Sequence, residues 1–199
     1  MPKKSTAVLV ALIFGMGALF FSCAGIQTKP TAANFKAPVV DIELIDVPWY
    51  DGYWYYGGNI EPTKGQAGNH GAPLPIAITF AITNPNPYPI LLEGYNFVLA
   101  FEDLDMTTVN GYEAQWIPAG KTNQLRVTTL ITTRSALLKL GVTSGYKLKE
   151  KGINMWEAME RFWTTIPDMA FPINIYEGTF SYSADGVSKA FPFKGTYPE

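Results

Sequence analysis

The sequence predicts an all-β protein, a two-sheet antiparallel β-sandwich with one flanking helix. Two observations predict this fold class: short segments in which apolar and polar residues alternate, and turn signals between those segments. With 199 residues, of which 47% are hydrophobic and 14% aromatic, the chain is too apolar to be disordered. It is also long enough to bury one core of its own.

Six segments carry the period of two that a half-buried strand requires. In the first, VVDIELIDV, the apolar residues Val40, Ile42 and Leu44 alternate with acidic ones, so we expect these three on the buried face. Asp185-Gly186 stands between the last two segments and is a hairpin signal. The other five segments are IAITFAIT (76–83), GYNFVLAFE (94–102), QLRVTTLIT (124–132), FPINIYEGTFSY (171–182) and VSKAFPF (187–193).

One segment has helical spacing instead. Its apolar residues are Met155, Trp156, Met159, Phe162 and Trp163. They recur every three or four positions, as on the apolar side of a helix, and Asn154 is suited to cap the helix N-terminus. The sequence therefore predicts a helix near 154–163 on the flank of the sheets.

The stretch ITNPNPYPI, Ile82–Ile90, follows a strand pattern directly and contains three prolines. Pro85 and Pro87 cannot donate to a strand ladder, and each pushes the preceding asparagine out of the helical region. We therefore expect an edge strand to end here and the chain to turn. The side chains of Asn84 and Asn86 are expected to cap the freed backbone groups locally. This predicts a structural corner rather than a ligand site.

The N-terminus has the order of an export signal. Lys3 and Lys4 precede an apolar run, residues 7–21, which is shorter than the ~20 residues of a membrane-spanning helix. The chain's single cysteine, Cys23, follows this run. Its placement resembles the lipobox of bacterial lipoproteins, in which a peptidase cuts before the cysteine and the thiol carries diacylglycerol. The alternatives are an ordinary signal peptide with an incidental cysteine, or an uncleaved anchor.

The lipoprotein interpretation divides the chain into a signal peptide (1–22), a lipidated tether (23–37) and a sandwich domain (38–199). The lipid on Cys23 would attach the protein to a membrane of the cell envelope. Ala24 is not the aspartate that retains bacterial lipoproteins at the inner membrane, so the outer membrane is favoured, on its periplasmic or surface face. The mature chain has 13 basic and 17 acidic residues, which gives no basic stripe for nucleic acid.

An ordered series of segments resembles a known family. A strand ending in Asn84-Pro85-Asn86 is followed by ILLEGYNFVLAFEDLDM, WIPAGKTNQLRVTTLIT, a helix and YEGTFSYSADGVSKAFPFKG. This series is similar to the LEA14-like, or water-stress and hypersensitive-response (WHy), domain of the type 2 late-embryogenesis-abundant group, over roughly Pro38 to Phe193. The resemblance implies an immunoglobulin- or fibronectin-III-like sandwich, an association with desiccation or water stress and with the bacterial envelope, and no catalytic residues.

An aromatic insertion, residues 48–75, departs from the family pattern. Its aromatic residues are Trp49, Tyr50, Tyr53, Trp54, Tyr55 and Tyr56. They have three candidate uses: to cap the open end of the sandwich, to contact a glycan or a partner protein, or to lie against a lipid surface. Rings exposed together would favour a contact, and rings buried separately would favour a cap.

The inventory of reactive residues does not favour catalysis. The single histidine, His70, lies in a glycine-rich stretch without a neighbouring carboxylate, and Cys23 is expected to be lipidated. Glu102, Asp103 and Asp105 lack the ligand spacing of a calcium loop, so we expect them in a solvated hairpin turn. The sequence therefore predicts no enzyme, no metal, no cofactor and no small-molecule substrate.

Two functional hypotheses follow. The first is a non-catalytic, lipid-anchored envelope protein whose sandwich is a structural or stress-protective module. The alternative is an envelope binding module in which the aromatic residues from Trp49 to Tyr56 contact a glycan or a partner protein.

Overall fold

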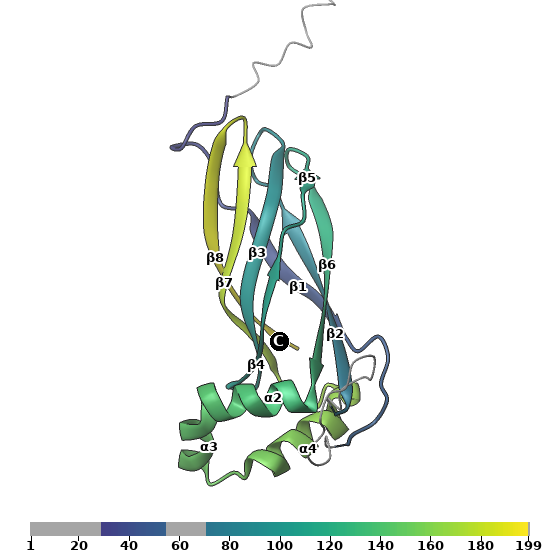
Figure 1. Cartoon of the computed structure of the whole chain (residues 1–199). Helices are drawn as coiled ribbons and strands as arrows, with labels where there is room; N and C mark the ends of the chain where they lie inside the picture. The colour runs from purple at the N-terminus through teal and green to yellow at the C-terminus, as the bar shows by residue number, and fades with distance from the viewer. Residues whose placement is uncertain (1–28, 55–70, 199) are drawn as a thin grey trace, which may run out of the picture.

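In the computed structural model, which describes residues 29–54 and 71–198, the chain forms an elongated sandwich with helices across one end (Figure 1). The first sheet has the order β1-β2-β6 and is antiparallel; its strands are β1 (Val39–Asp46), β2 (Pro73–Thr83) and β6 (Thr122–Thr132). The second sheet has the order β4-β3-β7-β8, and a short β5 also pairs with β3. Its strands are β3 (Ile90–Phe101), β4 (Leu104–Gly111), β5 (Gln115–Ile117), β7 (Ile173–Ala184) and β8 (Val187–Tyr197). The predicted fold class is confirmed.

The last two strands form the predicted hairpin. Ala184 pairs with Val187 across a two-residue turn, in which Asp185 and Gly186 have φ values of 43° and 80°. Two successive positive φ values characterise a type I′ turn, whose twist matches that of the flanking strands. We call the end of the molecule that holds this turn the turn end.

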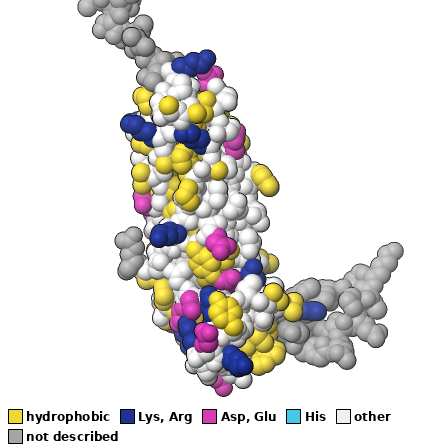
Figure 2. Space-filling view, turned by 90° about the vertical axis from the view of Figure 1, so that its left-hand side faces the viewer, with side chains coloured by type: hydrophobic (Ala, Val, Ile, Leu, Met, Phe, Trp, Pro, Cys, Tyr) yellow, Lys and Arg dark blue, Asp and Glu magenta, His cyan; other side chains and the backbone are white. Residues whose placement is uncertain are grey.

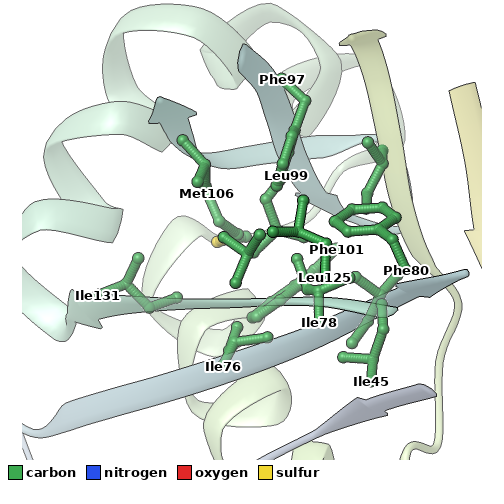
Figure 3. Close-up of a cluster of buried hydrophobic side chains, with 14 of the residues drawn as sticks. Ile45, Ile76, Ile78, Phe80, Phe97, Leu99, Phe101, Met106, Leu125 and Ile131 are labelled. Carbon is green, nitrogen blue, oxygen red and sulfur yellow. The ribbon is translucent and has the colours of Figure 1, made fainter. Parts of the chain in front are cut away.

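The core lies between the two sheets (Figure 3). Phe80 of β2 meets Phe97 of β3 and Phe180 of β7 edge-on, with ring centroids 5.7 and 5.4 Å apart. Such edge-to-face pairs add about 0.5–1.5 kcal/mol each to the free energy of burying the rings. The sheets are therefore joined by interlocked aromatic rings as well as by aliphatic side chains.

The alternation in β1 breaks at a β-bulge, which corrects one prediction. The register against β2 shifts between Ile42 and Leu44. A bulge inserts one extra residue, so the side chains beyond it change faces. As a result Ile45 is buried, whereas Leu44, predicted to be buried, is exposed.

The strand that ends at the proline corner is also placed differently from the prediction. β2 is hydrogen-bonded on both sides, to β1 and to β6, so it is the middle strand of its sheet and not an edge strand. The prolines still end it, because Pro85 and Pro87 lie beyond its last paired residue, Thr83.

The helical part is larger than predicted. The expected helix is present as α4 (Met155–Thr165), and the Asn154 side chain accepts a hydrogen bond from the Trp156 backbone N–H (2.8 Å). A second helical segment was not predicted; it consists of α2 (Thr133–Lys139), a π-helical turn (Leu140–Ser144) and α3 (Gly145–Lys151). It begins directly at the end of β6, where Thr132 and Ser135 cap each other's backbone N–H groups.

The helices close the end of the sandwich opposite the turn end, and we call this the helical end (Figure 1). Phe162 of α4 packs against Phe101 of β3 and against Phe171, with ring centroids 5.4 and 4.8 Å apart. Trp163, the next residue of α4, is fully buried. Helix α4 therefore covers the core at this end.

Candidate functional site

Several residues singled out in the sequence lie outside the part of the chain that the structure describes. These are Cys23, Tyr55, Tyr56 and His70. Among the described residues, no helix combines the length and apolar character needed to cross a membrane.

The N-terminal segment, which we define as residues 29–36, belongs to the packed domain. Phe35 is buried against Tyr88 and Phe191, with ring centroids 6.1 and 6.0 Å away. The predicted boundary at Pro38 is therefore too late, and the predicted tether is partly packed on the sandwich. The sequence signal for this packing is Phe35 itself, a single aromatic residue in a stretch of small and polar residues.

The asparagines of the corner Asn84–Pro87 make the predicted local hydrogen bonds and, in addition, hydrogen bonds to distant segments. Asn84 is 0% exposed, and its side-chain NH₂ lies within hydrogen-bonding distance of the carbonyls of Tyr88 (2.8 Å), Ile117 (3.1 Å) and Pro118 (3.2 Å). One amide side chain thus joins the start of β3 to the end of β5. Removing it would take this donor from the carbonyls of Tyr88 and Ile117, and a buried carbonyl left without a donor costs about 1–3 kcal/mol.

The second asparagine of the corner pairs with the N-terminal segment. Asn86, 1% exposed, accepts a hydrogen bond from the Lys36 N–H (2.8 Å) and donates one to the Lys36 carbonyl (3.0 Å). Asn84 in turn accepts from both the backbone N–H and the side-chain NH₂ of Asn86 (2.9 and 3.0 Å). Pro85 and Pro87, each of which follows one of these asparagines, are exposed.

The aromatic loop, which we define as residues 47–54, leaves three of its rings partly in solvent. Trp49 is 46% exposed, Tyr50 38% and Trp54 42%. Tyr53 is half-buried and packs against the core. The insertion is therefore divided: one described ring contributes to the core, and three are presented at the surface.

The aromatic loop is hydrogen-bonded to the helical end through the Tyr50 side chain and the Trp54 carbonyl. The Tyr50 hydroxyl donates to the Trp163 carbonyl (2.8 Å), and partial burial raises the pKa of the Tyr50 phenol above its usual value. The Trp54 carbonyl accepts from the Thr133 hydroxyl (3.1 Å) and from the Ala72 N–H (3.3 Å). Because these bonds hold the loop at Tyr50 and at Trp54, its backbone has less conformational entropy to lose when its rings meet a partner.

Further exposed apolar side chains lie on the helices of the same end, namely Leu138, Val142, Tyr146 and Trp156. In Figure 2, hydrophobic side chains at this end lie among charged ones. The four-residue spacing of Leu138, Val142 and Tyr146 is a helical signal in the sequence, although no helix was predicted there. Trp156 was assigned to the apolar side of α4 but is half-exposed, whereas Trp163 is buried.

The acidic hairpin between β3 and β4 is held by basic residues of the helices. Arg161 pairs with both carboxylate oxygens of Glu102 (2.8 and 2.9 Å), and Lys151 pairs with Asp103 (2.5 Å). The hydrogen bond from Lys151 holds the pKa of the Asp103 carboxyl below its usual value. Within residues 29–54 and 71–198, no group of three or more His, Cys, Asp or Glu residues is arranged to hold a metal ion.

Comparisons with known proteins give little further information. No family model and no curated protein matches the chain. Among solved structures, a protein from Archaeoglobus fulgidus is 10% identical, with a TM-score of 0.39, covering 78% of this chain and 94% of that one. A target of the Northeast Structural Genomics Consortium is 12% identical, with a TM-score of 0.41, covering 81% of this chain and 87% of that one. At these scores neither likeness bears on function.

Proposed function

We propose that this protein is a non-catalytic, lipid-anchored protein of the cell envelope that presents the helical end of its sandwich as a contact surface. The observation that carries the proposal is the partial exposure of Trp49, Tyr50 and Trp54 on a loop that is hydrogen-bonded to α4 through the Tyr50 hydroxyl and to the start of α2 through the Trp54 carbonyl. Exposed aromatic side chains on a fixed backbone are typical anchors of binding surfaces.

The direction of the chain supports this arrangement. The N-terminal segment meets the sandwich at the turn end, where Lys29 and Asp185 form an ion pair (3.9 Å). The aromatic loop lies beside the helices at the opposite end (Figure 1). A lipid on Cys23 would therefore attach the turn end to the membrane, most favourably the outer membrane, and leave the helical end directed away from it.

The chemistry of the surface fits a glycan or a protein of the envelope. Tryptophan and tyrosine offer flat apolar faces for stacking together with polar edges for hydrogen bonds. Two basic side chains of this end are paired with acidic ones, Arg161 with Glu102 and Lys151 with Asp103. Recognition at this end would therefore depend on ring contacts more than on long-range charge attraction.

The contact can be tested by capture from crosslinked membranes with the full-length protein as bait. We expect the double variant Trp49→Ala/Trp54→Ala to retain the fold and to lose the partner. Loss of a binding anchor costs about 2 kcal/mol or more, which corresponds to roughly 30-fold in affinity. Purified cell-wall glycan, tested in the same way, separates a glycan from a protein partner.

Trp116→Ala is the matched control for this capture. Trp116 is 59% exposed but lies on β5, toward the turn end (Figure 1). Equal losses in the control and the double variant would contradict a specific contact at the helical end. No loss in either would leave the aromatic loop without a binding role.

The anchor is tested separately by Cys23→Ser in cells fed labelled fatty acid. We expect the wild type to incorporate the label and the variant to remain an unlabelled, uncleaved or soluble exported form. Equal incorporation into both proteins would refute lipidation at Cys23. Fractionation of the envelope then shows whether the labelled protein resides in the outer membrane.

A structural or desiccation-protective module is the second candidate. It is favoured by the resemblance to the LEA14-like domain and by the size of the core, which forms one cluster from Phe35 to Ala184. Cells lacking the protein would survive drying less well under this hypothesis. Full rescue by the Trp49→Ala/Trp54→Ala variant would assign the role to the sandwich alone, and failed rescue would assign it to the aromatic loop.

A further inference from the structure

The corner Asn84–Pro87 and its surroundings form a site that is filled by the chain's own N-terminal segment. Asn86 pairs with both backbone groups of Lys36, as a neighbouring strand would. Because Asn84 accepts from Asn86 twice, the Asn86 amide is held in the orientation that this pairing needs. The site is therefore preorganised by buried side chains of the sandwich.

Three further contacts hold the same segment. Phe35 fills a position between Tyr88 and Phe191, and the Lys189 ammonium donates to the Phe35 carbonyl (3.3 Å). The Tyr88 hydroxyl donates to the Asn34 side-chain oxygen (3.0 Å). The bound stretch therefore extends at least from Asn34 to Lys36, and it contacts β8 as well as the corner.

We propose that the Asn84–Pro87 corner is a docking site for the N-terminal segment, and that docking fixes the sandwich close to its anchor and in one orientation. Without docking, the fifteen residues Ala24–Pro38 would form a flexible tether with a maximal reach of about 50 Å. With docking, seven residues, Ala24–Pro30, separate Cys23 from the turn at Thr31, and their reach is about 25 Å.

The fixed orientation of the sandwich depends on the proposed anchoring at Cys23. Docking of the N-terminal segment does not depend on that anchoring. A short connection at the turn end keeps that end near the membrane. The helical end then faces outward, where its aromatic rings can meet a partner. A long, free tether would instead let the sandwich tumble and present all of its faces.

Hydrogen exchange of the Lys36 amide in the full-length protein tests the docking. In the wild type this N–H is bonded to Asn86, so it should be protected, whereas Asn86→Ala should speed its exchange at least tenfold. Asn123→Ala is the matched control, since Asn123 makes one exposed hydrogen bond, to the Trp116 carbonyl. An unprotected Lys36 amide in the wild type, or unchanged exchange in a folded Asn86→Ala variant, would overturn the proposal.

A second variant covers the case in which Asn86→Ala fails to fold. Phe35→Ala leaves the corner itself intact but removes the ring that holds the segment. We expect trypsin to cleave after Lys36 in this variant at least tenfold faster than in the wild type, while the sandwich remains resistant. Equal cleavage rates would show that the segment is not held through Phe35.

The short connection is tested by attaching a dye to a Ser188→Cys variant in membranes and measuring its quenching by a lipid-bound acceptor. Ser188 is exposed and lies near the turn end. Quenching should be strong with the docked segment and should fall when Phe35→Ala is added. Equal quenching would overturn the orientation. A protein that is absent from membranes would instead refute the proposed anchor, while the exchange of the Lys36 amide would still test the docking.

Discussion

The proline corner and the aromatic loop both follow a strand directly, but their side chains differ in burial. At the corner the asparagine amides are buried, and they are hydrogen-bonded to other parts of the same chain. In the loop the backbone is fastened, while Trp49 and Trp54 remain nearly half exposed. This difference is the basis for our proposal that the helical end, and not the turn end, is the contact surface.

The largest expected effect separates core from surface within a single helix. Trp163→Ala should lower the free energy of unfolding by about 3–5 kcal/mol, because it removes a fully buried ring of α4. Trp156→Ala, seven residues earlier on the same helix, should cost less than about 1 kcal/mol because its ring is half-exposed. Chemical denaturation measures both. Equal losses would mean that the helical end is packed throughout and offers no contact surface.

The next effect concerns the buried corner. Asn84→Ala should cost about 3 kcal/mol or more, since the carbonyls of Tyr88 and Ile117 lose this donor and Asn86 loses its acceptor. For a domain of this size the melting temperature would fall by roughly 6–12 °C. Asn123→Ala, with its single exposed hydrogen bond, should change it little. A melting temperature within a degree of the wild type for Asn84→Ala would contradict the role given to the corner.

A smaller loss is expected from the aromatic loop. Trp49→Ala and Trp54→Ala each remove a ring that is already nearly half in solvent, so each should cost about 1 kcal/mol rather than the 3–5 kcal/mol of a core ring. Thermal melts of the single variants measure this loss. Losses of core size would show that the loop is a cap, and the comparison between the two regions would fail.

The prolines of the corner should have the smallest effect. Pro85 and Pro87 are exposed, so replacing either by alanine mainly increases the freedom of the unfolded chain. We expect a loss of about 0.4–1 kcal/mol for each. A folded variant of unchanged melting temperature that no longer captures its partner would show that the corner, too, is a recognition site.

The strands and the α4 helix could be predicted because their patterns are local. The period of two in β2 and β6 and the helical spacing before Phe162 depend on neighbours in the sequence. The bulge that exposes Leu44 could not be predicted, because the extra residue does not change the kinds of residue found in this strand. The helix that follows Thr132 was missed because its N-cap, Thr132, is also the last residue of a β-strand pattern that runs directly into the helix.

The functional features were harder to predict, since they depend on distant contacts. The Asn84 amide bonds to Ile117, thirty-three positions away, and Asn86 bonds to Lys36, fifty positions away. Local rules for asparagine in turns suggest only nearby partners. The division of the aromatic insertion, with Tyr53 packed and Trp49 exposed, likewise depends on where α4 closes the core.

The most direct test of the contact surface is photo-crosslinking in living cells, with a photoreactive phenylalanine analogue placed at position 54 or at position 116 of the full-length protein. Both positions hold exposed tryptophans, one beside the helices and one on β5. We expect a discrete crosslinked species from position 54 and little or none from position 116. Crosslinks from position 116 alone, or equal crosslinking from both positions, would contradict a contact surface at the helical end.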